Sequence, residues 1–178
     1  MRVAVCEYGA GNMRSVRLAF ARLGAQETDD VLAADLAVLP GVGSARAAMA
    51  GLRARGHDTA LRQRFDDGRP ILGICLGLQL ALEETEEDGG VAGLGLVPGR
   101  AVRLREGRVP RIGWAHVDDR GAFYFAHSSA AETPVASARS EGVVAEVRHG
   151  SFVGCQFHPE KSGAAGAAYL ESVCRSLV

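Results

Sequence analysis

The most constraining feature of this sequence is a short apolar run that leads straight into a cysteine flanked by glycines. Residues 71–74 have the length and composition of a fully buried strand, and residues 76–84 have the pattern of a helix. Cys75 therefore lies on a strand-to-helix turn, with Gly73 and Gly77 two positions to either side. A side chain at either glycine would crowd the backbone of so tight a turn. The stretch predicts a βα unit with a cysteine at its apex.

A G-x-C-x-G turn is typical of a nucleophile elbow, here with sulfur where hydrolases carry a hydroxyl. The helix that follows directs its N–H groups at the sulfur, which favours a thiolate and offers a donor to an oxyanion. The ordinary alternative is that Cys75 is a small buried apolar residue. The flanking glycines and the polar Gln79, one helical turn later, favour the functional interpretation.

Strand and helix patterns alternate through the first two-thirds of the chain, and shorter strand patterns follow. Strands are expected at 2–6 and 35–39, and helices at 13–23, 44–52 and 58–65. The acidic run 83–88 is expected to be a solvated helix end. Pro98-Gly99 and Glu106-Gly107 break the strand patterns at 94–104 and 108–117, which predicts antiparallel hairpins, and further short strands are expected at 123–126, 143–147 and 151–157. With a C-terminal helix around Leu170, this predicts an α/β fold: an open, mostly parallel sheet flanked by helices, with a smaller antiparallel portion.

Composition narrows the class of protein. A length of 178 residues suits one domain, 1–178, and the net charge of −1 gives no reason to expect nucleic acid or an anionic membrane as partner. No apolar run approaches the length of a membrane span, and the N-terminus opens with a strand pattern and not a secretory leader. The four cysteines form no C-x-x-C pair, so we expect no metal and a reduced, cytoplasmic protein.

Two glycine-containing loops follow the first two predicted strands. Gly9-Ala10-Gly11-Asn12 has only two of the three glycines of a dinucleotide fingerprint, so that interpretation is rejected. Pro40-Gly41-Val42-Gly43, taken alone, is most simply a loop. Its place at the C-terminal end of a parallel strand is where ligands bind in open α/β sheets, and a second oxyanion donor is expected there. Ser44 is expected to cap the next helix.

A thiolate nucleophile usually needs a histidine base and a group that orients it. His158 stands out among five histidines because it follows an apolar strand, Pro159 ends that strand, and Glu160 comes two residues later. In an extended segment residues i and i+2 point the same way, so Glu160 is expected to reach back to the imidazole. The pattern predicts a Cys-His-Glu triad. His127 is expected near the site, and surface positions are expected for His57, His116 and His149.

The motifs G-I-C-L-G-L-Q and Q-F-H-P-E-K-S-G resemble those of the class I, triad-type glutamine amidotransferases, which have a flavodoxin-like fold. More narrowly, Y-G-A-G-N, V-P-x-I-G-W, F-Y-F-A-H-S and H-P-E-K-S-G are similar to the glutaminase subunits of imidazole glycerol phosphate synthases, over nearly the whole chain. The resemblance implies hydrolysis of L-glutamine to glutamate and ammonia without a cofactor. It also implies transfer of the ammonia to a (β/α)8-barrel cyclase partner in a heterodimer of histidine biosynthesis.

The resemblance also implies roles for individual residues. Cys75 would attack the side-chain amide of glutamine, with His158 as base and Glu160 orienting it. The oxyanion would be held by the N–H of Leu76 and by one from the Gly41-Val42 peptide. The residues implied to bind glutamine are Gln79, Glu87, His127, Ser128 and Ser129, and those implied to face the cyclase are Asn12, Trp114, Tyr124 and Lys161.

The sequence departs from the family pattern in three places, all in the half expected to face the synthase. Ala115 replaces the usual asparagine, Ser129 replaces the usual aromatic residue, and the segment 117–123 is unusually short. One alternative is a triad glutaminase that serves an anthranilate, pyridoxal phosphate or amino-sugar pathway. The other is a catalytically silent regulatory domain of the same fold, which the intact Cys75, His158 and Glu160 disfavour.

Overall fold

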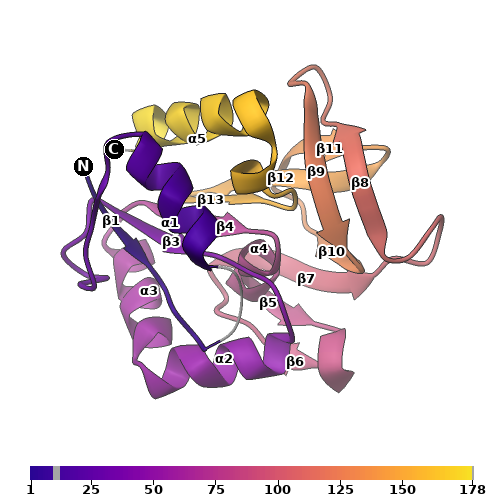
Figure 1. The fold of residues 1–178 in the computed structure, drawn as a ribbon. Helices are drawn as coiled ribbons and strands as arrows, with labels where there is room; N and C mark the ends of the chain where they lie inside the picture. The colour runs from indigo at the N-terminus through magenta and orange to yellow at the C-terminus, as the bar shows by residue number, and fades with distance from the viewer. Residues whose placement is uncertain (10–12, 178) are drawn as a thin grey trace.

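A computed structural model describes residues 1–9 and 13–177 of the chain. In the described residues a seven-stranded central sheet has the order β11-β12-β13-β4-β3-β1-β2 (Figure 1). The strands are β1 (Arg2–Val5), β2 (Gln26–Glu27), β3 (Leu36–Leu39), β4 (Ile71–Ile74), β11 (Ala136–Ser140), β12 (Val143–His149) and β13 (Phe152–Cys155). Five of them, from β13 to β2, are parallel, and β12 and β11 extend the edge in antiparallel fashion. The predicted mostly parallel α/β fold is confirmed.

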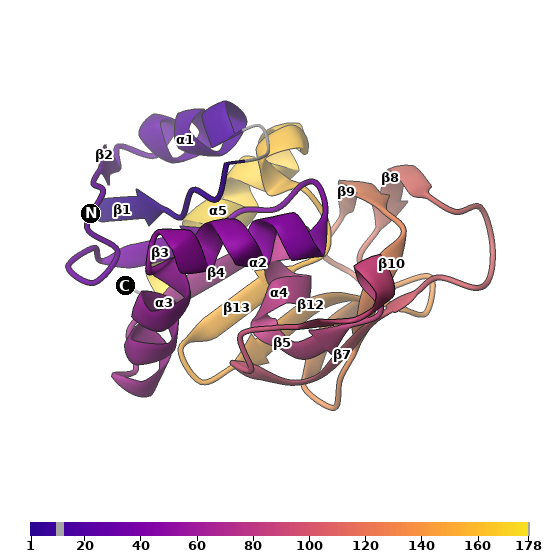
Figure 2. The ribbon, with the colours of Figure 1, turned by 90° about the horizontal axis from the view of Figure 1, so that it is seen from below.

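Helices cover both faces of this sheet, as Figures 1 and 2 show. One face carries α1 (Met13–Arg22) and α5 (Gly163–Leu177), and the other carries α2 (Ala45–Ala54), α3 (His57–Asp66) and α4 (Leu76–Ala81). Successive strand side chains point to opposite faces, so Leu36 and Val38 join the first core while Ala37 and Leu39 join the second. Within the described residues, the search for a helix long and apolar enough to cross a membrane finds none.

A second layer of short strands extends from the carboxyl edge of the central sheet. A four-stranded sheet has the order β10-β7-β5-β6, formed by β10 (Ser129–Glu132), β7 (Val97–Arg103), β5 (Leu82–Thr85) and β6 (Val91–Ala92). A separate two-stranded ribbon pairs β8 (Arg111–His116) with β9 (Ala122–His127) and stands at the side of the molecule in Figure 1. These strands surround α4 and the turn that carries Cys75.

The helix after Cys75 is shorter than the sequence pattern predicts. It ends at Ala81, and residues 82–85 form β5, so the prediction of a helix through 84 was wrong. The carbonyls of Leu80, Ala81 and Leu82 accept hydrogen bonds from the N–H groups of residues 94, 96 and 95, respectively, instead of serving a continued helix. The acidic run is likewise no helix end, because it passes through β5 into the 3₁₀ helix η1 (Glu87–Gly89).

The strand pairing in the second layer also differs from prediction. Pro98-Gly99 does not break β7, which pairs with β5 and β10 and does not form a hairpin with β8. A register shift between Leu82 and Glu84 of β5 accommodates this part of β7. The hairpin that does form is β8–β9, closed by the turn in which Val117 N–H donates to Gly121 O.

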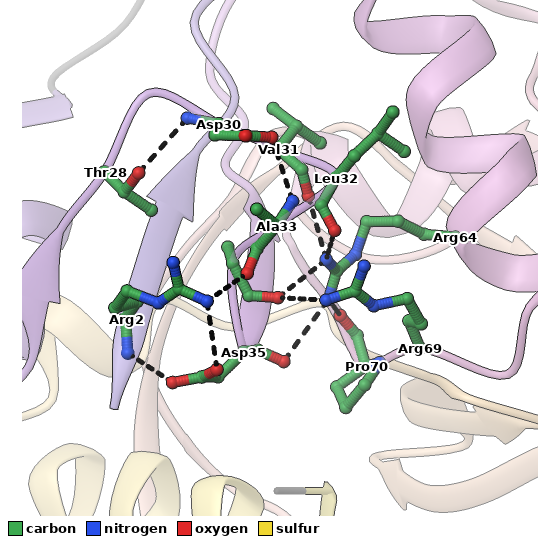
Figure 3. Close-up of polar contacts among 11 residues, drawn as sticks. Arg2, Thr28, Asp30, Val31, Leu32, Ala33, Asp35, Arg64, Arg69 and Pro70 are labelled. Carbon is green, nitrogen blue, oxygen red and sulfur yellow. Dashed lines mark hydrogen bonds and ion pairs between the residues drawn. The ribbon is translucent and has the colours of Figure 1, made fainter.

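Arg64 fastens the opposite, amino-terminal edge of the sheet. This α3 side chain is fully buried, and within the described residues its hydrogen bonds all go to backbone carbonyls (Figure 3). The acceptors lie just before β3 and just before β4: Val31 (2.8 Å), Leu32 (3.3 Å), Ala34 (2.8 Å), Asp35 (3.3 Å) and Pro70 (2.8 Å). One guanidinium therefore holds the starts of two central strands together.

Replacement of Arg64 by methionine is expected to lower the free energy of unfolding by about 3 kcal/mol or more, because several buried carbonyls lose their donor. Urea denaturation of the purified chain measures this loss. Arg53→Met, at an exposed position of α2, is the matched control and should change the free energy little. Equal stability of the two variants would contradict the role given to Arg64.

Candidate active site

Cys75 lies at the apex of the predicted strand-to-helix turn. It joins β4 to α4 with φ 52° and ψ −108°, a strained conformation for a residue other than glycine. The flanking glycines are needed sterically, since a Cβ at Gly77 would lie 1.8 Å from Leu39 O and one at Gly73 would lie 2.7 Å from the Phe152 ring. The elbow geometry is therefore as predicted.

The structure brings His158 and Glu160 together beside this turn. His158 follows β13, the direct neighbour of β4, and its Nδ1–H donates to Glu160 Oε1 at 2.8 Å. Both side chains are almost completely buried. The reason given for the contact was wrong: residues 159–161 form a 3₁₀ helix, η2 (Pro159–Lys161), and not an extended segment. It is this tight turn after His158 that places the carboxylate on the imidazole.

The charge state of His158 is set by its two neighbours. Burial opposes protonation of the imidazole, but Cys75 on one side and Glu160 on the other outweigh it and raise the pKa of His158 to about 9. Among the described residues Nε2 has no hydrogen-bond partner, and it is the ring nitrogen left for Cys75. The arrangement therefore favours an imidazolium beside the sulfur at neutral pH.

We expect the imidazole of His158 to be protonated at pH 7 and to titrate near pH 9 in nitrogen-15 NMR spectra. Because this folded-state pKa exceeds the unfolded value of about 6.5, the interaction stabilises the fold fully below about pH 6.5. That contribution is lost as the pH rises through 9. Glu160→Gln should lower the titration midpoint, and a neutral His158 at pH 7 in the wild-type chain would contradict this assignment.

The loop after β3 lies against the elbow, as expected for an oxyanion site. A Cβ at Gly41 would lie 2.3 Å from Gly77 N, so the two backbones are in direct contact. The Val42 N–H, however, donates to the Tyr8 hydroxyl at 3.1 Å, and Tyr8 in turn donates to Pro40 O at 3.1 Å. In this conformation the Val42 N–H is engaged elsewhere, so the expected second donor is not free.

A cleft of about 240 Å³ opens in front of Cys75. Its lining includes all the residues predicted for the oxyanion and for glutamine: Gly41, Val42, Leu76, Gln79, Glu87, His127, Ser128 and Ser129. A larger cleft of about 670 Å³ lies along residues 100–112 and is rich in arginine, but it contains none of the triad. We take the smaller cleft as the site because the nucleophile and the elbow helix open into it.

Three buried amides and imidazoles form a chain of hydrogen bonds behind the cleft. Gln79 Nε2 donates to Ser129 O (2.7 Å) and to Gln156 Oε1 (3.1 Å), and Gln156 Nε2 donates to Cys75 Sγ (3.5 Å). His127 Nδ1–H donates to the same Ser129 carbonyl at 2.9 Å. Burial lowers the pKa of His127 to about 4, so its ring is neutral at pH 7 and Nε2 carries a lone pair. Sequence reasoning missed Gln156, although it lies two residues before His158.

Glu87 is tied to the start of α2 through its neighbour. Asp88, with φ 55°, accepts from Ser44 Oγ (2.6 Å) and Arg46 N–H (3.0 Å). Ser44 also caps α2 by accepting from Ala47 N–H, as predicted. Burial and the nearby Asp88 raise the pKa of Glu87, while the N–H of Ala45 opposes the shift. The loop that carries Glu87 is thus fixed against the loop that carries Gly41 and Val42.

The residues predicted to face a partner lie on the ribbon and beside the triad. Trp114 on β8 is 59% exposed and contacts Tyr124 on β9 edge to face, with ring centroids 6.2 Å apart. Ile112, on the same strand, is also exposed. Lys161 is exposed at the end of η2. The prediction for Asn12 falls outside the described residues.

Comparison with known proteins identifies relatives across the whole chain. The family model "Glutamine amidotransferase class-I" matches residues 11–176. The imidazole glycerol phosphate synthase subunit HisH of Methanothermobacter thermautotrophicus is 44% identical, covering 96% of both chains. The subunit of the same name from Streptococcus gordonii is 39% identical, covering 94% of this chain and 92% of that protein.

A solved structure supports the fold. The crystal structure of a glutamine amidotransferase superposes with a TM-score of 0.79 at 21% sequence identity, over 97% of this chain and 98% of the other. At that identity the likeness concerns the fold alone. It includes the arrangement that places the turn after β4 beside the segment after β13.

Proposed function

Since this chain belongs to the class-I glutamine amidotransferases, and within them to the family of the HisH subunits, we propose that it is the glutaminase subunit of an imidazole glycerol phosphate synthase. It hydrolyses L-glutamine and supplies ammonia to a synthase. The whole chain acts as one glutamine amidotransferase domain in the cytoplasm. The observation that carries the proposal is the buried His158–Glu160 pair beside the Cys75 elbow, in a chain related to HisH over nearly its full length.

The triad residues act in sequence on the side-chain amide of glutamine. The Cys75 thiolate attacks the amide carbon, and the imidazolium of His158 delivers a proton to the departing ammonia. A water then attacks the thioester with His158 as base, which releases glutamate and restores Cys75. Glu160 keeps Nδ1 protonated, so Nε2 is the nitrogen that exchanges protons with the substrate. The N–H of Leu76, at the start of α4, stabilises the oxyanion, with Val42 as the second donor once it is released.

The cleft offers glutamine a set of acceptors for its α-ammonium group. Both Gln79 Nε2 hydrogens are engaged, so Gln79 presents Oε1 to the cleft. His127 presents the bare Nε2 of a neutral ring, and Glu87 presents a carboxylate. The backbone of Ser128 and Ser129 completes the wall. These groups distinguish free glutamine from an amide that lacks the α-amino group.

The partner we propose is a (β/α)8-barrel cyclase that consumes the ammonia. The exposed Trp114 and Ile112 of the β8–β9 ribbon and the exposed Lys161 form the docking face, since large apolar side chains near solvent are common interface anchors. The ribbon borders the cleft, because Ile112 and Ala126 line it. Docking there would close the cleft mouth and direct ammonia into the partner.

Two experiments test this function against its alternatives. Labelling of Cys75 with a glutamine-mimicking electrophile separates an active glutaminase from a silent regulatory domain. Co-purification with the barrel cyclase, followed by a coupled assay, separates this synthase from an anthranilate, pyridoxal phosphate or amino-sugar enzyme. Failure to bind the cyclase or to support its glutamine-dependent reaction would overturn the proposal.

Replacement of Lys161 by alanine is expected to weaken binding to the cyclase or to uncouple glutamate formation from cyclase product. The ammonium group is exposed directly after Glu160 and can pair with an acidic group of the partner. Titration calorimetry and the ratio of glutamate to product measure both effects. Cys75 labelling should be unchanged, and wild-type affinity with a one-to-one product ratio would show that Lys161 is only surface charge.

A further inference from the structure

Gln156 contacts the nucleophile from within the core. It follows the last residue of β13 and is completely buried, with its backbone N–H bonded to Ala145 O at 2.9 Å. Its side-chain Nε2 lies 3.5 Å from Cys75 Sγ, a hydrogen-bonding distance for sulfur. His158 is two residues further along the same segment. The sulfur is therefore contacted by an amide donor as well as flanked by the imidazole.

The orientation of the Gln156 amide follows from its neighbours. Ser129 O can only accept, so the group that Gln79 turns towards it at 2.7 Å must be the NH2. The second hydrogen of that NH2 points to Gln156 at 3.1 Å, which requires the Gln156 oxygen there. The Gln156 NH2 must then face Cys75 Sγ. A single backbone carbonyl thus fixes a donor, and not an acceptor, at the sulfur.

We propose that Gln156 is a further catalytic residue, whose amide N–H stabilises the Cys75 thiolate. A hydrogen bond to a charged acceptor is stronger than one to a neutral acceptor, so the contact favours the thiolate over the thiol. It acts from a side of the sulfur that the imidazolium does not occupy. The same amide fixes Gln79, which links the reactivity of the nucleophile to the residue that faces glutamine. The proposal rests on the role of Cys75 in the proposed function.

The test is the rate at which iodoacetamide alkylates Cys75 at pH 7, followed by mass spectrometry of the peptide that contains it. Neither glutamine nor the partner is needed. Gln156→Met keeps the length of the side chain but removes the donor, and we expect the rate to fall about tenfold, the order of one charge-assisted hydrogen bond. Gln63→Met, at an exposed position of α3, is the matched control and should react at the wild-type rate.

A second variant separates the sulfur contact from a general role in packing. Gln79→Met removes the neighbour of Gln156 but leaves the Gln156 amide beside Cys75, so alkylation should slow less than in Gln156→Met. Equal slowing in both variants, or a wild-type rate in Gln156→Met, would overturn the proposal. If Gln156→Met does not fold, Gln156→Asn carries the same test, because its amide is one methylene too short to reach both neighbours.

The outcomes also distinguish this proposal from the proposed function. Wild-type Cys75 that reacts no faster than Cys6, Cys155 and Cys174 would refute Cys75 as an activated nucleophile. Fast alkylation of wild-type Cys75 that Gln156→Met leaves unchanged would refute the role of Gln156 alone. In the complex with the cyclase, Gln156→Met should lower kcat for glutamine hydrolysis more than it raises KM, since the donor contacts the sulfur and not the substrate.

Discussion

Replacing Cys75 by alanine is expected to abolish glutamine-dependent turnover, with a loss of roughly ten-thousand-fold or more. The other members of the site cannot replace the sulfur, because its position depends on the strained turn between β4 and α4. The ammonia-dependent reaction of the cyclase should persist, since its catalytic site lies on another chain. Assays with glutamine and with ammonium salts, on the same complex, measure the two activities separately.

The alanine variant should also fold as the wild type does. Cys75 has a backbone conformation that alanine tolerates no worse, and the removed sulfur has only weak hydrogen bonds, to Ala126 O at 3.8 Å and from Gln156. Thermal unfolding and binding to the cyclase serve as controls. Substantial glutaminase activity in a folded Cys75→Ala variant would show that the triad assignment is wrong.

The isolated chain is expected to hydrolyse glutamine slowly and to accelerate about a hundredfold to a thousandfold with the cyclase and its nucleotide ligand. The structure gives the physical reason, because the Val42 N–H is held by the Tyr8 hydroxyl and one oxyanion donor is absent. The loss of one such donor typically reduces kcat by about that factor. Docking of a partner beside the loop would turn the Gly41-Val42 peptide. High glutaminase activity of the purified chain alone would contradict this expectation.

Tyr8→Phe tests this constraint in the isolated chain. Removing the hydroxyl frees the Val42 N–H from a bond worth about 1 kcal/mol, so basal glutaminase activity should rise by up to about tenfold. Burial raises the pKa of Tyr8 to about 12, so the hydroxyl stays protonated in the working pH range. Tyr169→Phe, in the other core, is the matched control. Basal activity that is equal in wild type and Tyr8→Phe would show that Tyr8 does not restrain the loop.

The sequence by itself determined the features that depend on neighbouring residues. The apolar run into Gly-x-Cys-x-Gly specified the turn, since only glycines fit where Gly73 and Gly77 meet other backbone. The alternation of β and α patterns specified the parallel sheet, and parallel strands bring their carboxyl ends to one edge. That is why Cys75 after β4 and His158 after β13 were placed together without coordinates.

Tertiary structure alone decided the features that depend on contacts between distant segments. The helix after Cys75 ends at Ala81 because the loop 93–96 takes its carbonyls, and β7 continues through Pro98-Gly99 because β5 and β10 pair with it. The engagement of Val42 by Tyr8 joins segments 34 residues apart. The Gln156–Cys75 contact spans 81 residues. Local pattern carries no record of which distant donor will find which acceptor, so these contacts became visible only once the chain was folded.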